Sequence, residues 1–224
     1  MRIPDDQTEL HSKLERKLRD ALYSESPGAM EGLRVRAYGD VEAQQVRYFF
    51  YVDVLQELVK AARYRREAAT AVLLGRFCLD DEGAFIEVEA FRGLEYLYGA
   101  DPVERTRPIV EEAFEAVEGG DDGRHVVGVF CARPGGDAQL DVDTARLHLS
   151  LFNLPYQLAM VIDGDHHRLG LYARRRNRAF FNAAFYVVEE RVGQEERDRT
   201  HGPVGDESMN DDEMELATFD GDDQ

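Results

Sequence analysis

Short apolar runs alternate with amphipathic stretches along most of the chain, which predicts a fold that mixes strands and helices. Residues 71–78 (AVLLGRFC) form a continuous apolar run, typical of a strand buried on both faces. A turn at 80–83 leads into a second strand at 84–91, and a third apolar strand at 125–130 runs into the turn PGG at 134–136. Residues 71–163 are expected to form one curved sheet wrapped by helices.

Further strands are predicted earlier and later in the chain. Residues 33–38 and 46–52 are rich in β-branched and aromatic side chains around Gly39 and Asp40, which indicates two strands or a hairpin. Residues 156–162 and 168–173 form a strand pair, turned by Asp-Gly-Asp at 163–165. A last strand or helix edge is expected at 180–190.

Helical spacing recurs in four places. Leucines at every fourth position, from Leu10 to Leu22, predict an amphipathic N-terminal helix that packs on the main domain or pairs with a partner helix. A second helix, capped by Asp53, has its apolar positions three and four apart: Val54, Leu55, Leu58, Val59 and Ala62.

The other two helices follow the first strands. Residues 104–118 place Ile109, Val110, Phe114 and Val117 inward, and the helix ends at glycines 119 and 120. The stretch 147–152 belongs to a helix that Asp141 or Asp143 would cap.

Composition and charge divide the chain into three parts. Residues 1–28 are the N-terminal helix, 29–192 are the folded domain, and 193–224 are an acidic tail. The tail carries −10 of the net charge of −18, and it has too little apolar surface to offset chain entropy, so we expect it to be disordered. The remaining −8 repels phosphate backbones and makes nucleic acid an improbable partner.

The composition also bears on compartment and cofactors. No apolar run is long enough to span a bilayer, and the first residues are acidic rather than basic, so a cytoplasmic protein without a membrane partner is expected. The two cysteines, Cys78 and Cys131, make no disulfide framework. Arginine outnumbers lysine by 24 to three, a bias that suggests a GC-rich or salt-adapted prokaryotic host.

The order of these elements and several local motifs resemble the JAB/MPN domain superfamily over residues 46–173. The matching segments are 50–63, 71–75 (AVLLG), 127–130 (VGVF) and 155–163 (PYQLAMVID). The resemblance implies an α/β fold, more narrowly α+β, in which a mixed curved β-sheet of the cytidine-deaminase-like type is flanked by helices.

The family's catalytic members are zinc hydrolases that cut isopeptide or peptide bonds, and the resemblance carries their motif onto five positions here. The strand that ends in His-x-His-Pro corresponds to Cys131, Ala132, Arg133 and Pro134. The Ser-x-x-Asp that begins seven residues after the proline falls on Asp141 and Thr144. The glutamate that takes the proton from the zinc-bound water corresponds to Ala68, and Glu67 is one residue away. The ligand aspartate corresponds to Thr144, and Asp143 is one residue away.

Every zinc ligand is therefore substituted, and Arg133 puts a fixed positive charge where a cation would lie. We expect a metal-free, cofactor-free pseudoenzyme that acts as a scaffold or protein-interaction domain, with a protein partner or as a homodimer. Arg133 would pair with Asp141 or Asp143 and hold the two loops together. The alternative is a divergent JAMM-like isopeptidase or metallohydrolase with a site rebuilt around Cys131, Asp141, Asp143 and His166.

Three further groups are candidates for chemistry. Cys131 beside Arg133 is a possible nucleophile, although a buried cysteine is more often a small apolar residue. His166 and His167, in a turn with Asp163 and Asp165, form either a metal cluster or an exposed hairpin tip, whereas His125 and His148 are interpreted as structural.

The last candidate is a basic cluster formed by Arg174, Arg175, Arg176 and Arg178 beside aromatic residues. It suggests an interaction site for an acidic protein partner or for the chain's own tail, with RNA as a third alternative.

Overall fold

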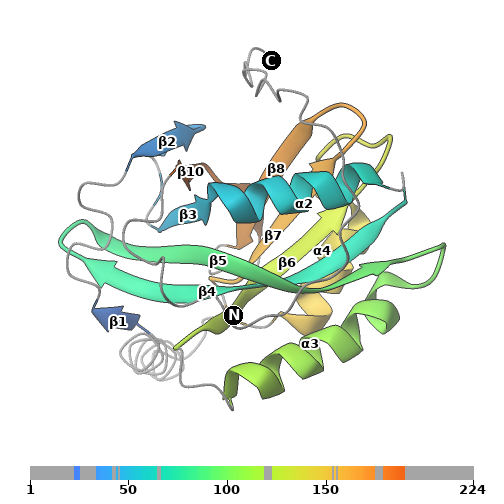
Figure 1. The fold of residues 1–224 in the computed structure, drawn as a ribbon, viewed down its shortest axis with the longest axis horizontal. Coiled ribbons are helices and arrows are strands. Elements are labelled where there is room, and N and C mark those ends of the chain that lie inside the picture. The colour runs from blue at the N-terminus through green and yellow to red at the C-terminus, as the bar shows by residue number, and fades with distance from the viewer. Residues whose placement is uncertain are drawn as a thin grey trace, which may run out of the picture.

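The computed structural model describes residues 34–41, 44, 46–64, 67–118, 123–152, 154, 156–174 and 179–189, and the backbone of Tyr23–Glu25. Over these residues the chain forms a mixed α+β fold in which a curled sheet is flanked by helices (Figure 1). The expected N-terminal helix at Leu10–Leu22, the acidic tail and the arginines at 175, 176 and 178 lie outside the described residues.

The sheet is built around two long strands, β4 (Ala69–Asp80) and β5 (Gly83–Tyr96), which form an antiparallel hairpin. Its order is β2-β10-β3-β5-β4-β6-β7-β8-β9, and β1 (Tyr23–Glu25) adds to β4 outside this path. The other strands are β2 (Val35–Tyr38), β3 (Arg47–Tyr51), β6 (His125–Ala132), β7 (Leu158–Asp163), β8 (Arg168–Arg174), β9 (Phe180–Asn182) and β10 (Phe185–Val188).

The last two strands show how strongly the sheet curls. Only Ala183 and Ala184 separate β9 from β10, yet β9 pairs with β8 at one end of the order and β10 lies between β2 and β3 at the other. Three residue steps span at most roughly 10 Å, so the two ends of the sheet must lie close together. A backbone hydrogen bond of 2.7 Å from Ala183 N to Leu171 O fixes this crossing.

Helices cover both faces of the sheet. Helix α2 (Val52–Tyr64) buries Val54, Leu58, Ala61 and Ala62, and it packs on one face of the sheet against β5, β6 and β7. Helices α3 (Pro102–Glu118) and α4 (Val142–Leu151) pack together on the opposite face, over Val72, Val129 and Ala159 (Figure 1). The strands between them are buried on both sides, which explains their continuous apolar sequence.

Most predicted elements are present within a few residues of their expected ends, but three details were wrong. Of the two alternatives for residues 33–52, two separate strands are confirmed, because β10 lies between β2 and β3 and they do not form a hairpin. Asp53 lies in the first turn of α2 and does not cap it, since the helix begins at Val52. Phe114 is 36% exposed, while its neighbour Ala113 is fully buried. The segment 180–190 is two short strands in different parts of the sheet, not one element.

Candidate functional site

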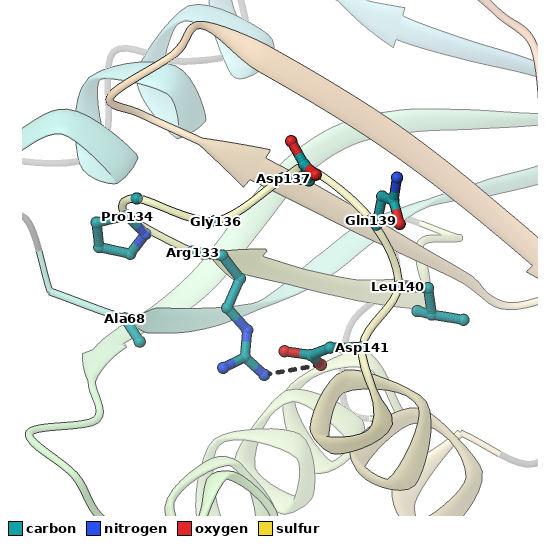
Figure 2. A pocket seen from close by; sticks show the side chains of 9 residues that line it. Ala68, Arg133, Pro134, Gly136, Asp137, Gln139, Leu140 and Asp141 are labelled. Carbon is teal, nitrogen blue, oxygen red and sulfur yellow. Dashed lines mark hydrogen bonds and ion pairs between the residues drawn. The ribbon is translucent and has the colours of Figure 1, made fainter. Parts of the chain in front are cut away.

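The candidate site lies where β6 ends. The Arg133 N–H donates to Ile162 O at 2.8 Å, which extends the pairing of β6 with β7 by one residue and fixes the arginine backbone. The chain then turns at Pro134 and Gly135, where Gly135 has φ +70°, and crosses above the sheet to the start of α4 (Figure 2). The Arg133 side chain points from the strand end toward the first turn of that helix.

Asp141 is the N-cap of α4, so of the two predicted capping residues it is the one confirmed. Its backbone is extended, and its Oδ1 accepts from the Thr144 N–H at 2.7 Å. The same oxygen accepts from Arg133 Nη2 at 3.1 Å, and Nη2 also donates to Thr144 Oγ1 at 3.0 Å. The expected arginine–aspartate contact is thus present, and it involves Asp141. Asp143 lies 3.8 Å from Arg146 on the surface of the helix.

Cys131 lies beneath this network. Its side chain faces α3 and α4 within the apolar layer and is 2% exposed. Burial raises the pKa of the thiol to about 12, although the positive charge of Arg133 and a hydrogen bond with Thr144 act in the opposite direction. A thiol with this pKa stays protonated at neutral pH, which disfavours Cys131 as a nucleophile.

Ala68 closes the site from the side of β4. Its carbonyl accepts from Leu97 N at 2.8 Å, so the residue is held just before the strand begins, and its methyl group lies opposite the Arg133 guanidinium. Glu67, the neighbouring carboxylate, is exposed. The five positions that the resemblance assigns to the motif, Ala68, Cys131, Arg133, Asp141 and Thr144, are therefore gathered around one place.

A cavity of about 560 Å³ opens in front of the guanidinium, a volume typical of small-ligand sites. Its lining combines Ala68 and Arg133 with the loop that follows β6 and with the cap of α4 (Figure 2). The full lining is Ala68, Arg133, Pro134, Gly135, Gly136, Asp137, Gln139, Leu140 and Asp141. On its rim, Asp137 forms an ion pair with Arg168 of β8, so this carboxylate is already engaged.

A layer of threonines under the cavity was not anticipated. Thr70 is the register partner of Cys131, and its hydroxyl lies 2.8 Å from that of Thr106 in α3. Both residues are buried, as is Thr144. The sequence signal was available, because Thr70 is a hydroxyl residue at the start of an otherwise apolar strand.

His166 and His167 are not among the residues that line the cavity. His166 Nδ1 lies 2.6 Å from Asp163 Oδ2, and His167 Nε2 lies 3.2 Å from Arg63 Nη2, with both rings exposed in the β7–β8 turn. Burial alone would raise the pKa of Asp163, but the hydrogen bonds from His166 and from the Asp165 N–H bring it below its usual value. Within the described part of the chain, no three His, Cys, Asp or Glu side chains are grouped so as to hold a metal ion.

His148 is buried in the opposite end of α4 from the cavity. Its Nε2 donates to Gln157 O at 2.9 Å, and its ring contacts Phe152 and Phe180. Burial lowers the pKa of His148 to about 4, so the ring is neutral at physiological pH. This agrees with the structural role expected from the sequence.

Strand β5 also carries a buried carboxyl pair that the sequence pattern did not predict. Glu87 is 4% exposed and Glu89 is 7% exposed. Glu89 pairs with Arg124 at 3.0 Å and with Arg76 at 3.4 Å. Burial, followed by the charge of Glu89, raises the pKa of Glu87 to about 7.

Of the basic cluster, only Arg174 lies within the described residues. It is half-buried, and its Nη2 donates to Leu154 O at 3.1 Å.

Every helix in the described ranges is too short or too polar to cross a bilayer.

Comparisons with known proteins add little to this geometry. No family model matches the chain, and no curated protein does. The fold is similar to the solution structure of protein DSY2949 from Desulfitobacterium hafniense, with 16% identity over 64% of this chain and 94% of that chain, and a TM-score of 0.45. A likeness of this size carries no argument about function.

Proposed function

We propose that the chain contains an MPN-like domain in which an arginine replaces the metal, and that it acts by binding a protein partner instead of by hydrolysis. One observation carries this proposal. Of five positions chosen from the family motif, spread from residue 68 to residue 144, Ala68, Arg133 and Asp141 line one cavity. The other two, Cys131 and Thr144, lie buried beneath it, and Arg133 donates hydrogen bonds to Asp141 and Thr144.

The arginine network explains how such a site could persist without a cation. In the family's hydrolases, zinc joins the strand end to the following helix through its ligands. Here Arg133 Nη2 joins the same two segments by donating to Asp141 and Thr144. The positive charge is retained and the connection is retained, but there is no open coordination position to activate a water.

The rival proposal, a hydrolase with a rebuilt site, requires Cys131, Asp141, Asp143 and His166 to converge. Asp141 caps α4 and accepts from Arg133, and Asp143 lies near Arg146. His166 is bonded to Asp163 in the β7–β8 turn. A dication would also have to displace or approach the Arg133 guanidinium in a partly buried cleft, which is unfavourable.

Metal analysis of the purified full-length chain, combined with its mass in solution, tests this proposal. After expression with added zinc, we expect far less than one zinc per chain and a discrete homodimer or a stable complex with a partner from the native source. One zinc per chain that disappears in Cys131→Ser would overturn the proposal in favour of the hydrolase. Cys78→Ser is the matched control, because Cys78 is also buried but lies on β4 outside the site.

A further inference from the structure

We propose that the cavity in front of Arg133 is a binding site for a carboxylate group of a peptide. This inference rests on the proposed function, since it names the chemistry that the same site would recognise in a partner.

A guanidinium has five N–H donors. Arg133 uses Nη2 for both of its hydrogen bonds, to Asp141 Oδ1 and to Thr144 Oγ1. Among the described residues, Nη1 and Nε have no hydrogen-bond partner of their own. Nη1 points toward the side of the cavity where Ala68 lies, and the methyl group of that residue leaves the space open (Figure 2).

Both acids that line the cavity already have cationic partners, which leaves room for a further anion. The negative charge of Asp141 is already shared between Arg133 and the Thr144 N–H, at a helix N-terminus that carries about half a positive charge. Asp137, the other acid of the lining, is paired with Arg168. A carboxylate bound to Nη1 would therefore meet a cation that its neighbours do not fully neutralise, and charge-assisted hydrogen bonds of this kind are the strong ones.

The volume of the cavity and the two glycines on its wall suit the end or a side chain of a peptide. Its volume of about 560 Å³ accommodates one or two residues, and Gly135 and Gly136 on its wall let a backbone approach closely. The Arg133 side chain is 20% exposed, so it can be reached from solvent yet is shielded enough for an ionic hydrogen bond to be strong.

Peptide titrations of the full-length protein, followed by the NMR amide shifts of Gly135 and Gly136, distinguish the two sources of a carboxylate. The probes are acetyl-Ala-Gly-Gly as the free acid and as the amide, and acetyl-Gly-Glu-Gly-amide beside acetyl-Gly-Gln-Gly-amide. We expect one acid to bind at least about tenfold more tightly than its neutral counterpart. The pair that discriminates identifies a chain terminus or an acidic side chain as the ligand.

Two variants connect this preference to Arg133. Arg133→Met should abolish the discrimination between acid and amide, whereas Arg92→Met, which removes an exposed arginine outside the cavity lining, should leave it within about twofold. Because Arg133→Met also removes a structural contact, Ala68→Glu provides a second test. Its carboxylate should occupy Nη1 and block the peptide acid, while Ala68→Gln blocks it less.

Equal binding of acid and amide in both pairs, discrimination that survives Arg133→Met, or no shift at Gly135 and Gly136 with millimolar peptide would overturn the inference. If the protein gives any of these results but remains zinc-free and self-associated or partner-bound, the proposed function still stands. Stoichiometric zinc in the wild-type protein would instead overturn the proposed function.

Discussion

At the scale of single residues, the site depends on one nitrogen. Arg133 Nη2 connects the end of β6 to the first turn of α4 through two hydrogen bonds, one of them to a carboxylate. Thr144 receives this contact at its hydroxyl, and its backbone N–H donates to the same aspartate oxygen. Three residues thus form a closed arrangement whose loss would free the intervening loop.

Replacing Arg133 with methionine keeps the apolar stem and removes these donors. We expect Arg133→Met to lower the free energy of unfolding by about 1–2 kcal/mol, since a hydrogen bond to a charged group contributes roughly that much at a partly exposed position. Urea denaturation of the variant beside Arg168→Met, whose exposed ion pair should matter less, checks this. An unchanged midpoint for Arg133→Met would show that the arginine does not hold the loops.

Glu87 should make stability fall as pH rises. The pKa of its folded-state carboxyl is raised to about 7 from 4.5, so its stabilising contribution is complete below pH 4.5 and is lost as the pH rises through 7. Glu87→Gln should equal the wild type in stability near pH 4.5 and exceed it by up to about 3 kcal/mol above pH 7. A stability difference that does not change with pH would contradict the placement of a buried acid here.

His148 should act in the opposite direction. Its folded-state pKa is lowered to about 4 from 6.5, so its contribution is present above pH 6.5 and is lost as the pH falls toward 4. In His148→Gln the glutamine can keep a donor to Gln157 O. As the pH falls, the free energy of unfolding of this variant should therefore rise relative to that of the wild type, by up to about 3 kcal/mol at pH 4. Denaturation of both proteins between pH 4 and pH 8 measures how the free energy of unfolding changes with pH. Parallel curves for the two proteins would mean that the ring is not buried in its neutral form.

At the scale of elements, the junction of β6 and α4 depends on Asp141 in two ways, as a cap and as an ion-pair partner. The sequence allowed Asp141 or Asp143 in either role. The choice follows from backbone conformation, because Asp141 is extended, with φ −83° and ψ 173°, while Asp143 is already inside the first turn of the helix. The sequence pattern alone does not show which of the two aspartates has the extended backbone of a cap.

Substitutions at Asp141 can separate the two roles. Asp141→Asn keeps an oxygen that accepts from the Thr144 N–H and loses only the ionic part of the contact with Arg133, so it should cost under about 1 kcal/mol. Asp141→Ala loses both and should cost about 1–2 kcal/mol. Thermal denaturation ranks these variants, with Asp143→Ala as a near-neutral control. Equal losses of stability in Asp141→Asn and Asp141→Ala would exclude a capping role for Asp141.

At the scale of the whole molecule, the curled sheet brings β10 between strands that lie more than a hundred residues earlier in the chain. The central strands were predictable because burial on both faces leaves a continuous apolar run, as in β4 and β6. The position of β10 was not predictable, since pairing between distant segments depends on register and leaves no signal in the local sequence. Neither the threonine layer nor the Glu87–Glu89 pair belongs to the five motif positions that the resemblance assigned, so neither was predicted.

The central claim is that this site retains the geometry of a metal centre with Arg133 in the place of the cation. The most direct test restores two ligands in the double variant Arg133→His/Thr144→Asp, which keeps Cys131 as the third. Thr144 contacts both other positions, so the three side chains should converge on one ion and leave a fourth position for water. We predict about one zinc per chain by metal analysis and a tetrahedral cobalt spectrum, both lost when Cys131→Ser is added. A folded double variant that binds no more zinc than the wild type would contradict the account.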